Sequence, residues 1–448
     1  MGLPPPPSSG TPPGQGGGGP DGAGRVALPS VGGDHDGTER RDTMPPSPHP
    51  SAPASSRALR SGTALAAAAA LALPLSLAAS GTAAADTGPS GASADDLRAA
   101  LPEPTGDHPV GRTTLHLVDG EREDVWVGGP RQLMVTLWYP ARADAGRPAP
   151  YMTEAESAAM VAELGLELPA DLLHSGVRTS SRLDVPPARA RDGFPLVVLS
   201  PGAGHNRIEL SSLAEELASN GFVVAGVDHA HEAAPVEFPD GLVTECTGCQ
   251  SGEWALGATN RAEDVSFLLD RLTGPDPAWR WSRVIDASRI GMAGHSWGGT
   301  ATAETLRAED RVDAGINLDG PYYAPAVEEG LDKPLALIEN DQGNTWDGVE
   351  QMWPRLEGWR QWIRLDGSGH SNSIDRGVLM EQLGLTGVLT PEQWRAVFGD
   401  VGVERGLELV RTYSLAFFDH HLRGGDQPLL EDPGAFHPEL VVVEPDEG

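Results

Sequence analysis

A short segment in the middle of the chain, residues 289–299, combines a candidate nucleophile with the turn that such a nucleophile needs. Ser296 lies at the centre of Gly-His-Ser-Trp-Gly, between an apolar run and a run compatible with a helix. A serine in such a strand–turn–helix context sits on a sharp turn that exposes its hydroxyl, and the flanking glycines let strand and helix pass closely. We interpret Ser296 as the nucleophile of covalent catalysis. The alternative is a glycine-rich turn in which Ser296 caps the helix.

A serine hydroxyl becomes a nucleophile when a base takes its proton and an acid orients that base. In the chain order typical of this motif, the acid and then the histidine follow the serine. His370 is the candidate base because it lies in a Gly/Ser loop directly after a predicted strand, whereas His420 and His421 fall inside a predicted helix. Asp319 and Asp341 each follow a predicted strand. Spacing alone leaves the choice between these two acids open.

Acyl transfer also needs backbone donors for the negative charge that develops on the carbonyl oxygen. One donor is expected from Trp297, directly after the nucleophile, and the other from Ala203 in the glycine-rich loop after an apolar run. His229 and His231 also follow a predicted strand, but they precede the serine. We interpret them as pocket wall or as a supporting layer rather than as metal ligands.

The hydrophobic pattern indicates the elements that would position these residues. Alternating apolar and polar residues at 113–118 and 132–139 predict a pair of antiparallel strands. Predicted buried strands lie at 195–200, 221–227, 289–293, 314–318, 334–339 and 362–365, and predicted helices at 154–164, 208–219, 261–272, 300–307 and 406–422. Wholly apolar strands that alternate with helices are typical of a parallel sheet covered on both faces. The sequence therefore predicts an α/β-hydrolase fold with a mostly parallel central sheet.

The N-terminal part is not expected to belong to this domain. Residues 1–56 are rich in Pro, Gly and Ser and lack apolar periodicity, which predicts disorder. Residues 57–85 have the basic start, apolar centre and small-residue end of a secretory signal peptide, with cleavage near Ala85. Such a peptide normally begins a chain. We therefore hypothesise that translation starts at Met44 and that residues 1–43 are untranslated.

After cleavage, we expect a linker at 86–103 and the hydrolase domain at 104–448. The chain has a formal net charge of −32, which disfavours nucleic acid and anionic membranes as partners. The only cysteines are Cys246 and Cys249. In a secreted chain they are expected to form a disulfide, with a redox or metal role as the alternative. The predicted cleavage site contains no cysteine, which argues against a lipid anchor. The sequence implies neither a metal nor an organic cofactor.

Several of these segments together resemble the plasma-type platelet-activating-factor acetylhydrolase family, across roughly residues 104–422. The similar segments are 109–114, 133–140, 195–206, 217–227, 294–299 and 315–319. The resemblance implies a bacterial secreted serine esterase for short-acyl or phospholipid-type esters. It implies Asp319 as the acid, His370 as the base, and Ala203 and Trp297 as oxyanion donors. Pro201 stands where the animal enzymes have a histidine.

Two alternatives remain. Bacterial cutinase-like polyester and lipid-ester hydrolases share these motifs and carry the acid after the following strand, which here is Asp341. A secreted, non-catalytic binding protein is the second alternative. The loops at 141–192, 233–258 and 341–360 are expected to set the acyl length and the head group, and the sequence does not specify an oligomeric state.

Overall fold

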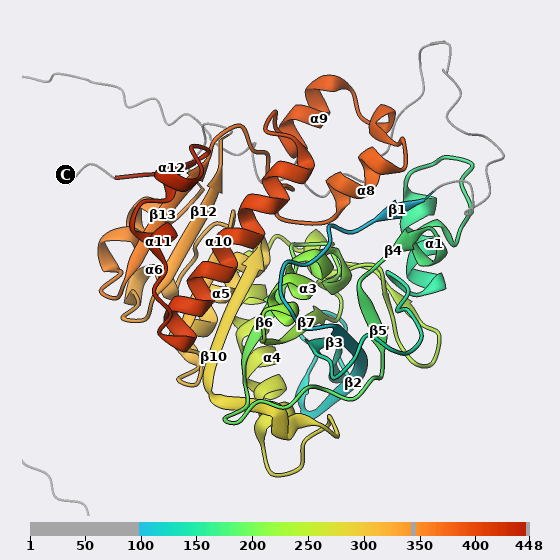
Figure 1. The fold of residues 1–448 in the computed structure, drawn as a ribbon, viewed down its shortest axis with the longest axis horizontal. Coiled ribbons are helices and arrows are strands. Elements are labelled where there is room, and N and C mark those ends of the chain that lie inside the picture. Colours follow the sequence, from blue (N-terminus) through green and yellow to red (C-terminus); the bar gives the residue numbers. More distant parts are fainter. Residues whose placement is uncertain (1–97, 342–345, 445–448) are drawn as a thin grey trace, which may run out of the picture. The chain divides into compact units, whose positions relative to one another are not determined.

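The computed structural model describes residues 98–341 and 346–444. The predictions for residues 1–85 lie outside the described residues. The centre of the described part is a ten-stranded sheet (Figure 1). In spatial order its strands are β14 (Leu440–Val442), β13 (Arg360–Leu365), β12 (Leu335–Asn340), β11 (Ala314–Leu318), β10 (Ile285–His295), β6 (Phe194–Ser200), β7 (Val223–His229), β3 (Pro130–Pro140), β2 (Val110–Glu123) and β5 (Ser181–Leu183).

The strands from β13 to β7 run parallel to one another, and β7–β3 and β3–β2 are antiparallel. Every residue of β6, β7, β11 and β12 is buried, because helices cover both faces of this part of the sheet. The predicted α/β-hydrolase fold is confirmed, including the antiparallel pair formed by β2 and β3.

Helices cover both faces of the sheet. On one face, α3 (Ser211–Ser219) and α10 (Val403–Arg423) pack against side chains such as Val197 and Ile316. On the other face, α4 (Trp254–Thr273) and α5 (Trp297–Ala308) pack against the alternate set, which includes Val198 and Met292. The period-two alternation of strand side chains thus divides the interior into two apolar layers. Figure 1 shows α10 crossing the sheet beside β10.

The remaining elements surround this framework. They are β1 (Ala99–Ala100), β4 (Val177–Arg178), β8 (Val236–Glu237), β9 (Val243–Thr244), α1 (Glu154–Glu163), α2 (Leu172–Ser175), α6 (Ala326–Glu329), α7 (Val349–Met352), α8 (Arg376–Gln382), α9 (Pro391–Phe398), α11 (Pro428–Glu431) and α12 (Pro433–Phe436). β1 pairs with β4, and Leu101 is buried. Residues 98–103, which we assigned to a linker, therefore pack against the hydrolase domain.

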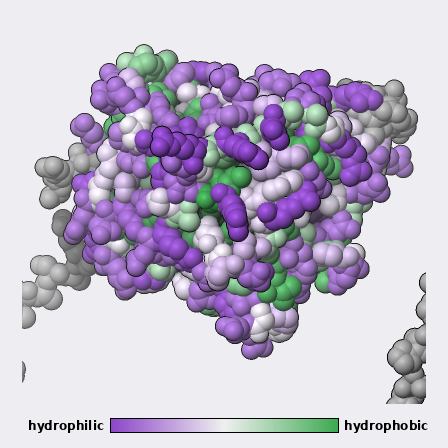
Figure 2. Space-filling model, turned by 60° about the horizontal axis from the view of Figure 1, so that its bottom comes forward, coloured by the Kyte–Doolittle hydropathy of each residue, from purple (hydrophilic) through white to green (hydrophobic). Residues whose placement is uncertain are grey.

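Figure 2 shows hydrophilic residues over most of one face, with hydrophobic residues in small, scattered groups. None of the helices in the described ranges is both long enough and apolar enough to span a membrane.

Candidate active site

Ser296 occupies a strained turn between β10 and α5. Its backbone has φ 54° and ψ −118°, a region that non-glycine residues rarely adopt. Its amide donates to the carbonyl of Leu318 at 2.8 Å, and its side chain is partly exposed. A Cβ on Gly294 would lie 2.1 Å from the backbone of Gly298, and one on Gly298 would lie 2.0 Å from the Ser200 carbonyl oxygen. The motif glycines therefore allow the backbone contacts that shape the turn.

These contacts predict the effect of a methyl group. Gly298→Ala is expected to push the turn away from the loop after β6 and to lower kcat/KM on the order of 10²-fold, because small displacements at a reacting centre are costly. Ester hydrolysis and thermal unfolding of the purified variant would be measured. Gly120→Ala is the matched control, since a Cβ there meets no atom within 4 Å. Equal kinetics for the two variants would contradict this account.

The predicted base and one predicted acid form a buried pair. His370 Nδ1 lies 2.5 Å from Asp319 Oδ2, and the two residues are 5% and 4% exposed. Burial opposes ionisation of Asp319, but His370 and the hydrogen bonds from Asn340 hold the pKa of its carboxyl below the usual value. An ionised Asp319 keeps the proton of His370 on Nδ1. Nε2 is then free to accept a proton from a serine hydroxyl.

The backbone ties this base to the nucleophile's turn. His295 Nε2 lies 3.0 Å from the carbonyl oxygen of His370, and the two imidazole rings are 4.6 Å apart. On the other side, the His205 ring lies 5.5 Å from that of His295. Burial lowers the pKa of both His205 and His295. The lowered pKa values disfavour a positive charge on either ring beside the base.

Asp341, the alternative acid, occupies a different environment. Its side chain is 40% exposed, lies 3.4 Å from Arg364 Nε and accepts the Gly367 amide at 3.1 Å. Among the contacts of the described residues, none joins Asp341 to His370. The structure therefore brings Asp319, and not Asp341, to His370.

The predicted oxyanion donors lie on segments that touch. Trp297 is the first residue of α5, so its amide has no acceptor within the helix, and the helix N-terminus favours negative charge. Ala203 lies in the loop that follows β6, and the start of this loop contacts Gly298. The arrangement brings the segments of both predicted donors to the carboxyl edge of the parallel strands.

The other residues singled out in the sequence contact the protein interior or the backbone. His229 is fully buried, with Nε2 3.0 Å from Ser200 Oγ, which places it in a supporting layer. The His231 carbonyl accepts the Gly248 amide at 2.8 Å. Cys246 and Cys249 form the predicted disulfide, with Cα atoms 5.3 Å apart. In the part of the chain that the structure describes, no group of three or more His, Cys, Asp or Glu side chains could hold a metal ion.

Three residues around the acid, Trp346, Asn340 and Glu339, were missed by the sequence analysis. Trp346 Nε1 donates to Asp319 Oδ1 at 2.8 Å, and the Trp346 ring lies 5.4 Å from that of His370. Asn340 donates to Asp319 from its backbone and its side chain. Glu339 accepts from Trp346 N at 3.3 Å and from Trp362 Nε1 at 2.9 Å. The sequence gives one indication of these residues. They lie at, or shortly after, the end of the predicted strand that follows the strand of Asp319.

Glu339 predicts a pH dependence of stability. Burial, followed by the charge of Asp319, raises the pKa of Glu339 to about 7. An acid with a raised pKa binds more protons in the folded state, so its effect is to lower stability as pH rises between its ordinary range and about 7. Glu339→Gln should flatten this decline, so that the wild-type Tm falls by a few degrees more than that of the variant between pH 5 and 8. Thermal scans would measure this, with the exposed Glu350→Gln as control. Parallel pH profiles for wild type and Glu339→Gln would contradict the expectation.

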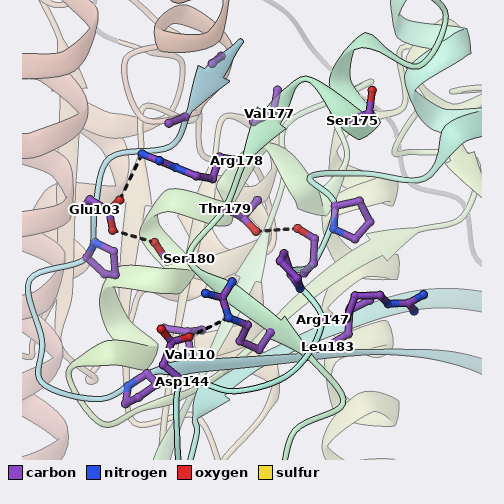
Figure 3. A pocket seen from close by; sticks show the side chains of 18 of the residues that line it. Glu103, Val110, Asp144, Arg147, Ser175, Val177, Arg178, Thr179, Ser180 and Leu183 are labelled. Carbon is purple, nitrogen blue, oxygen red and sulfur yellow. Dashed lines mark hydrogen bonds and ion pairs between the residues drawn. The ribbon is translucent and has the colours of Figure 1, made fainter. Parts of the chain in front are cut away.

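A separate cavity of about 1270 Å³ lies between the segment around β1 and the strands β4 and β5 (Figure 3). Ion pairs cross it between Arg178 and Glu103 at 3.6 Å and between Arg182 and Asp144 at 2.8 Å. None of the described residues that line it belongs to the predicted triad. This cavity is therefore distinct from the candidate active site.

The sequence and the fold are similar to those of known ester hydrolases. The family model of platelet-activating factor acetylhydrolase, isoform II, matches residues 94–241 and 279–427. A probable 1-alkyl-2-acetylglycerophosphocholine esterase of Arthroderma benhamiae is 29% identical over 77% of this chain and 94% of its own length. The platelet-activating factor acetylhydrolase of Cavia porcellus is 27% identical over 56% of this chain and 62% of its own.

A solved structure extends the likeness to another esterase. The ferulic acid esterase from Streptomyces cinnamoneus matches with a TM-score of 0.69 and 42% identity, over 77% of this chain and 99% of that one. The chain belongs to the platelet-activating factor acetylhydrolase family of isoform II type and is a carboxylic ester hydrolase.

Proposed function

We propose that the protein is a secreted serine esterase in which Ser296, His370 and Asp319 form the catalytic triad. The observation that carries this proposal is the buried His370–Asp319 pair, 2.5 Å apart, next to a strained Ser296 turn. Ion pairs with a purely structural role are common. Here, however, His370 is also hydrogen-bonded to His295, the residue before the strained Ser296, and this arrangement fits the requirements of nucleophilic catalysis.

In the proposed mechanism, Ser296 Oγ attacks the ester carbonyl carbon while His370 Nε2 takes the hydroxyl proton. Asp319 stabilises the imidazolium, and the amides of Ala203 and Trp297 donate to the oxyanion. Collapse of the tetrahedral intermediate breaks the ester C–O bond, and His370 returns the proton to the leaving alcohol. Water then gives a proton to His370 and attacks the acyl-enzyme, which releases the acid and restores Ser296.

Short-acyl or phospholipid-type esters are the proposed substrates, in line with the names of the curated relatives. A second candidate is an ester of an aromatic hydroxy acid, favoured by the 42% identity to a ferulic acid esterase and by Trp346 beside His370. Rates on p-nitrophenyl acetate, p-nitrophenyl palmitate, a 1-alkyl-2-acetylglycerophosphocholine and methyl ferulate would separate the two. A preference for the acetyl esters supports the first candidate, and a higher kcat/KM on methyl ferulate supports the second.

Secretion is part of the proposal. The predicted signal peptide, the Cys246–Cys249 disulfide and the similarity to plasma-type enzymes support it. N-terminal sequencing of the protein recovered from culture medium tests it, with Asp86 expected as the first residue. Recovery only in the cytosolic fraction, with the N-terminal segment intact, would refute it.

A further inference from the structure

A cluster of buried opposite charges lies beside the proposed oxyanion loop, residues 200–204. Its members Arg131, Glu232, Arg261 and Asp264 are fully buried, and Arg261 Nε donates to Glu232 Oε2 at 2.7 Å. The proposed mechanism uses none of these side chains. A buried ion pair adds little net stability, because the loss of solvation offsets the attraction. The role of the cluster is therefore better inferred from the neighbouring segments that it contacts than from its ion pairs.

The Glu232–Arg261 pair holds the oxyanion loop at both ends. At the start of the loop, Arg261 Nη1 donates to the Pro201 carbonyl at 2.6 Å and lies 3.3 Å from Ser200 Oγ. At its end, the Gly204 amide donates to the Glu232 carbonyl at 3.0 Å. The Ala203 amide, the proposed first donor, lies between these attachment points. The position of that amide therefore depends on the Arg261 side chain at one end of the loop and on the Glu232 backbone at the other, and the Glu232–Arg261 ion pair joins the two.

The same guanidinium contacts the residue that carries the second donor. The Arg261 guanidinium carbon lies 4.4 Å from the centre of the Trp297 ring, a cation–π arrangement. The indole of Trp297 is also fixed by donation from Nε1 to the Trp254 carbonyl at 2.8 Å. Arg261 thus touches both segments from which the oxyanion donors come.

A chain of hydrogen bonds orients Arg261 from behind. Ser200 Oγ lies 3.0 Å from His229 Nε2, and His229 Nδ1 lies 2.8 Å from Asp264 Oδ2. Arg131, together with His229, holds the pKa of Asp264 far below its usual value although burial opposes this. Donation therefore runs from Arg261 to Ser200, from Ser200 to His229 and from His229 to Asp264. This array resembles a triad in composition, but Ser200, His229 and Asp264 are fully buried, so no ester reaches it.

We propose that Glu232 and Arg261 form an oxyanion clamp: a pair of positioning residues that fixes the amides of Ala203 and Trp297 relative to each other. The inference rests on the proposed function, because it takes these amides as the oxyanion donors. Neither side chain touches the reacting atoms. We expect the clamp to stabilise mainly the transition state, in which the oxyanion forms. Its influence on substrate binding should be smaller.

The test combines kinetics with a transition-state mimic. Arg261→Lys keeps the charge but loses the planar fork that bonds Pro201, Ser200 and Glu232 together. It should lower kcat on p-nitrophenyl acetate by about 10- to 100-fold, with KM changed less than about threefold. The Ki of a trifluoromethyl ketone, which forms a tetrahedral oxyanion on the serine, should rise by the same factor as kcat/KM falls. Glu232→Gln and Ser200→Ala should give smaller changes in the same direction.

Controls separate positioning from folding. Rates are normalised to the sites labelled at completion by a fluorophosphonate, so unfolded molecules do not count. Arg360→Lys is the matched control, because Arg360 lies 5.2 Å from the Trp353 ring and donates to the carbonyls of Trp353 and Leu356. Unchanged kcat per labelled site and unchanged Ki in Arg261→Lys and Ser200→Ala would overturn the clamp and leave the triad standing. Wild-type activity that survives Ser296→Ala would overturn the proposed function and the clamp together.

Discussion

Replacement of Ser296 by alanine is expected to reduce kcat by on the order of 10⁴–10⁶-fold, the range seen when the nucleophile of a serine hydrolase is removed. The physical reason is that no other described hydroxyl occupies the strained turn beside the His370–Asp319 pair. Without Oγ, the remaining donors can polarise an ester carbonyl, but no acyl-enzyme can form. The measurement is hydrolysis of p-nitrophenyl acetate by wild type and variant.

Two controls accompany this measurement. Ser288→Ala changes an exposed serine before the turn and should leave kcat within about twofold of wild type. A fluorophosphonate should label the wild type and Ser288→Ala but not Ser296→Ala. Residual activity above a tenth of wild type would contradict the assignment of Ser296. Absence of labelling in the wild type would favour a non-catalytic binding protein.

The second large effect is expected at the acid. Asp319→Asn should lower kcat by about 10⁴-fold, as for loss of the triad carboxylate in other serine hydrolases. The Asp319 carboxylate accepts hydrogen bonds from Asn340 and Trp346 as well as from His370. An amide has one accepting oxygen and one donating nitrogen, so it cannot satisfy all these donors. It would then present a donor to His370 and stabilise the wrong tautomer.

Asp341→Asn is the matched control for this prediction. Its carboxylate is 40% exposed and pairs with Arg364, so the change should alter kcat by less than about threefold. Steady-state kinetics of both variants, with their Tm values, would be compared. A severe loss in Asp341→Asn with an active Asp319→Asn would restore the cutinase-like arrangement.

The choice between these two acids shows where sequence reasoning ends. Both residues follow a buried strand, and the distance along the chain does not say which strand lies next to the nucleophile. In the sheet, β11 pairs directly with β10, whereas β12 is one strand farther away. Asp319 also has φ 62°, which no simple sequence rule indicates for an aspartate. The resemblance to the family favoured Asp319, and spacing alone did not.

The fold was predictable because its signals are local. Runs of apolar residues and the Gly-x-Ser-x-Gly turn identify most parallel strands without any tertiary information. The contacts that refine the site are not local: Arg261 meets Pro201 across 60 positions, and Trp346 meets Asp319 across 27. Nothing in the pattern around these residues distinguishes them from ordinary helix and loop positions. The same applies to β1, whose partner β4 lies far along the chain.

The oxyanion clamp has a consequence for recombining related esterases. The family model stops at residue 241 and resumes at 279, so α4 with Arg261 lies between the matched stretches, whereas Glu232 lies within the first of them. Exchange of that stretch for one without an arginine at position 261 would leave the buried Glu232 paired with Arg131 but without Arg261. Loss of one partner of a buried ion pair typically costs about 3–5 kcal/mol. Chimaeras should therefore be joined ahead of residue 229 and after residue 264, so that both charges come from one parent.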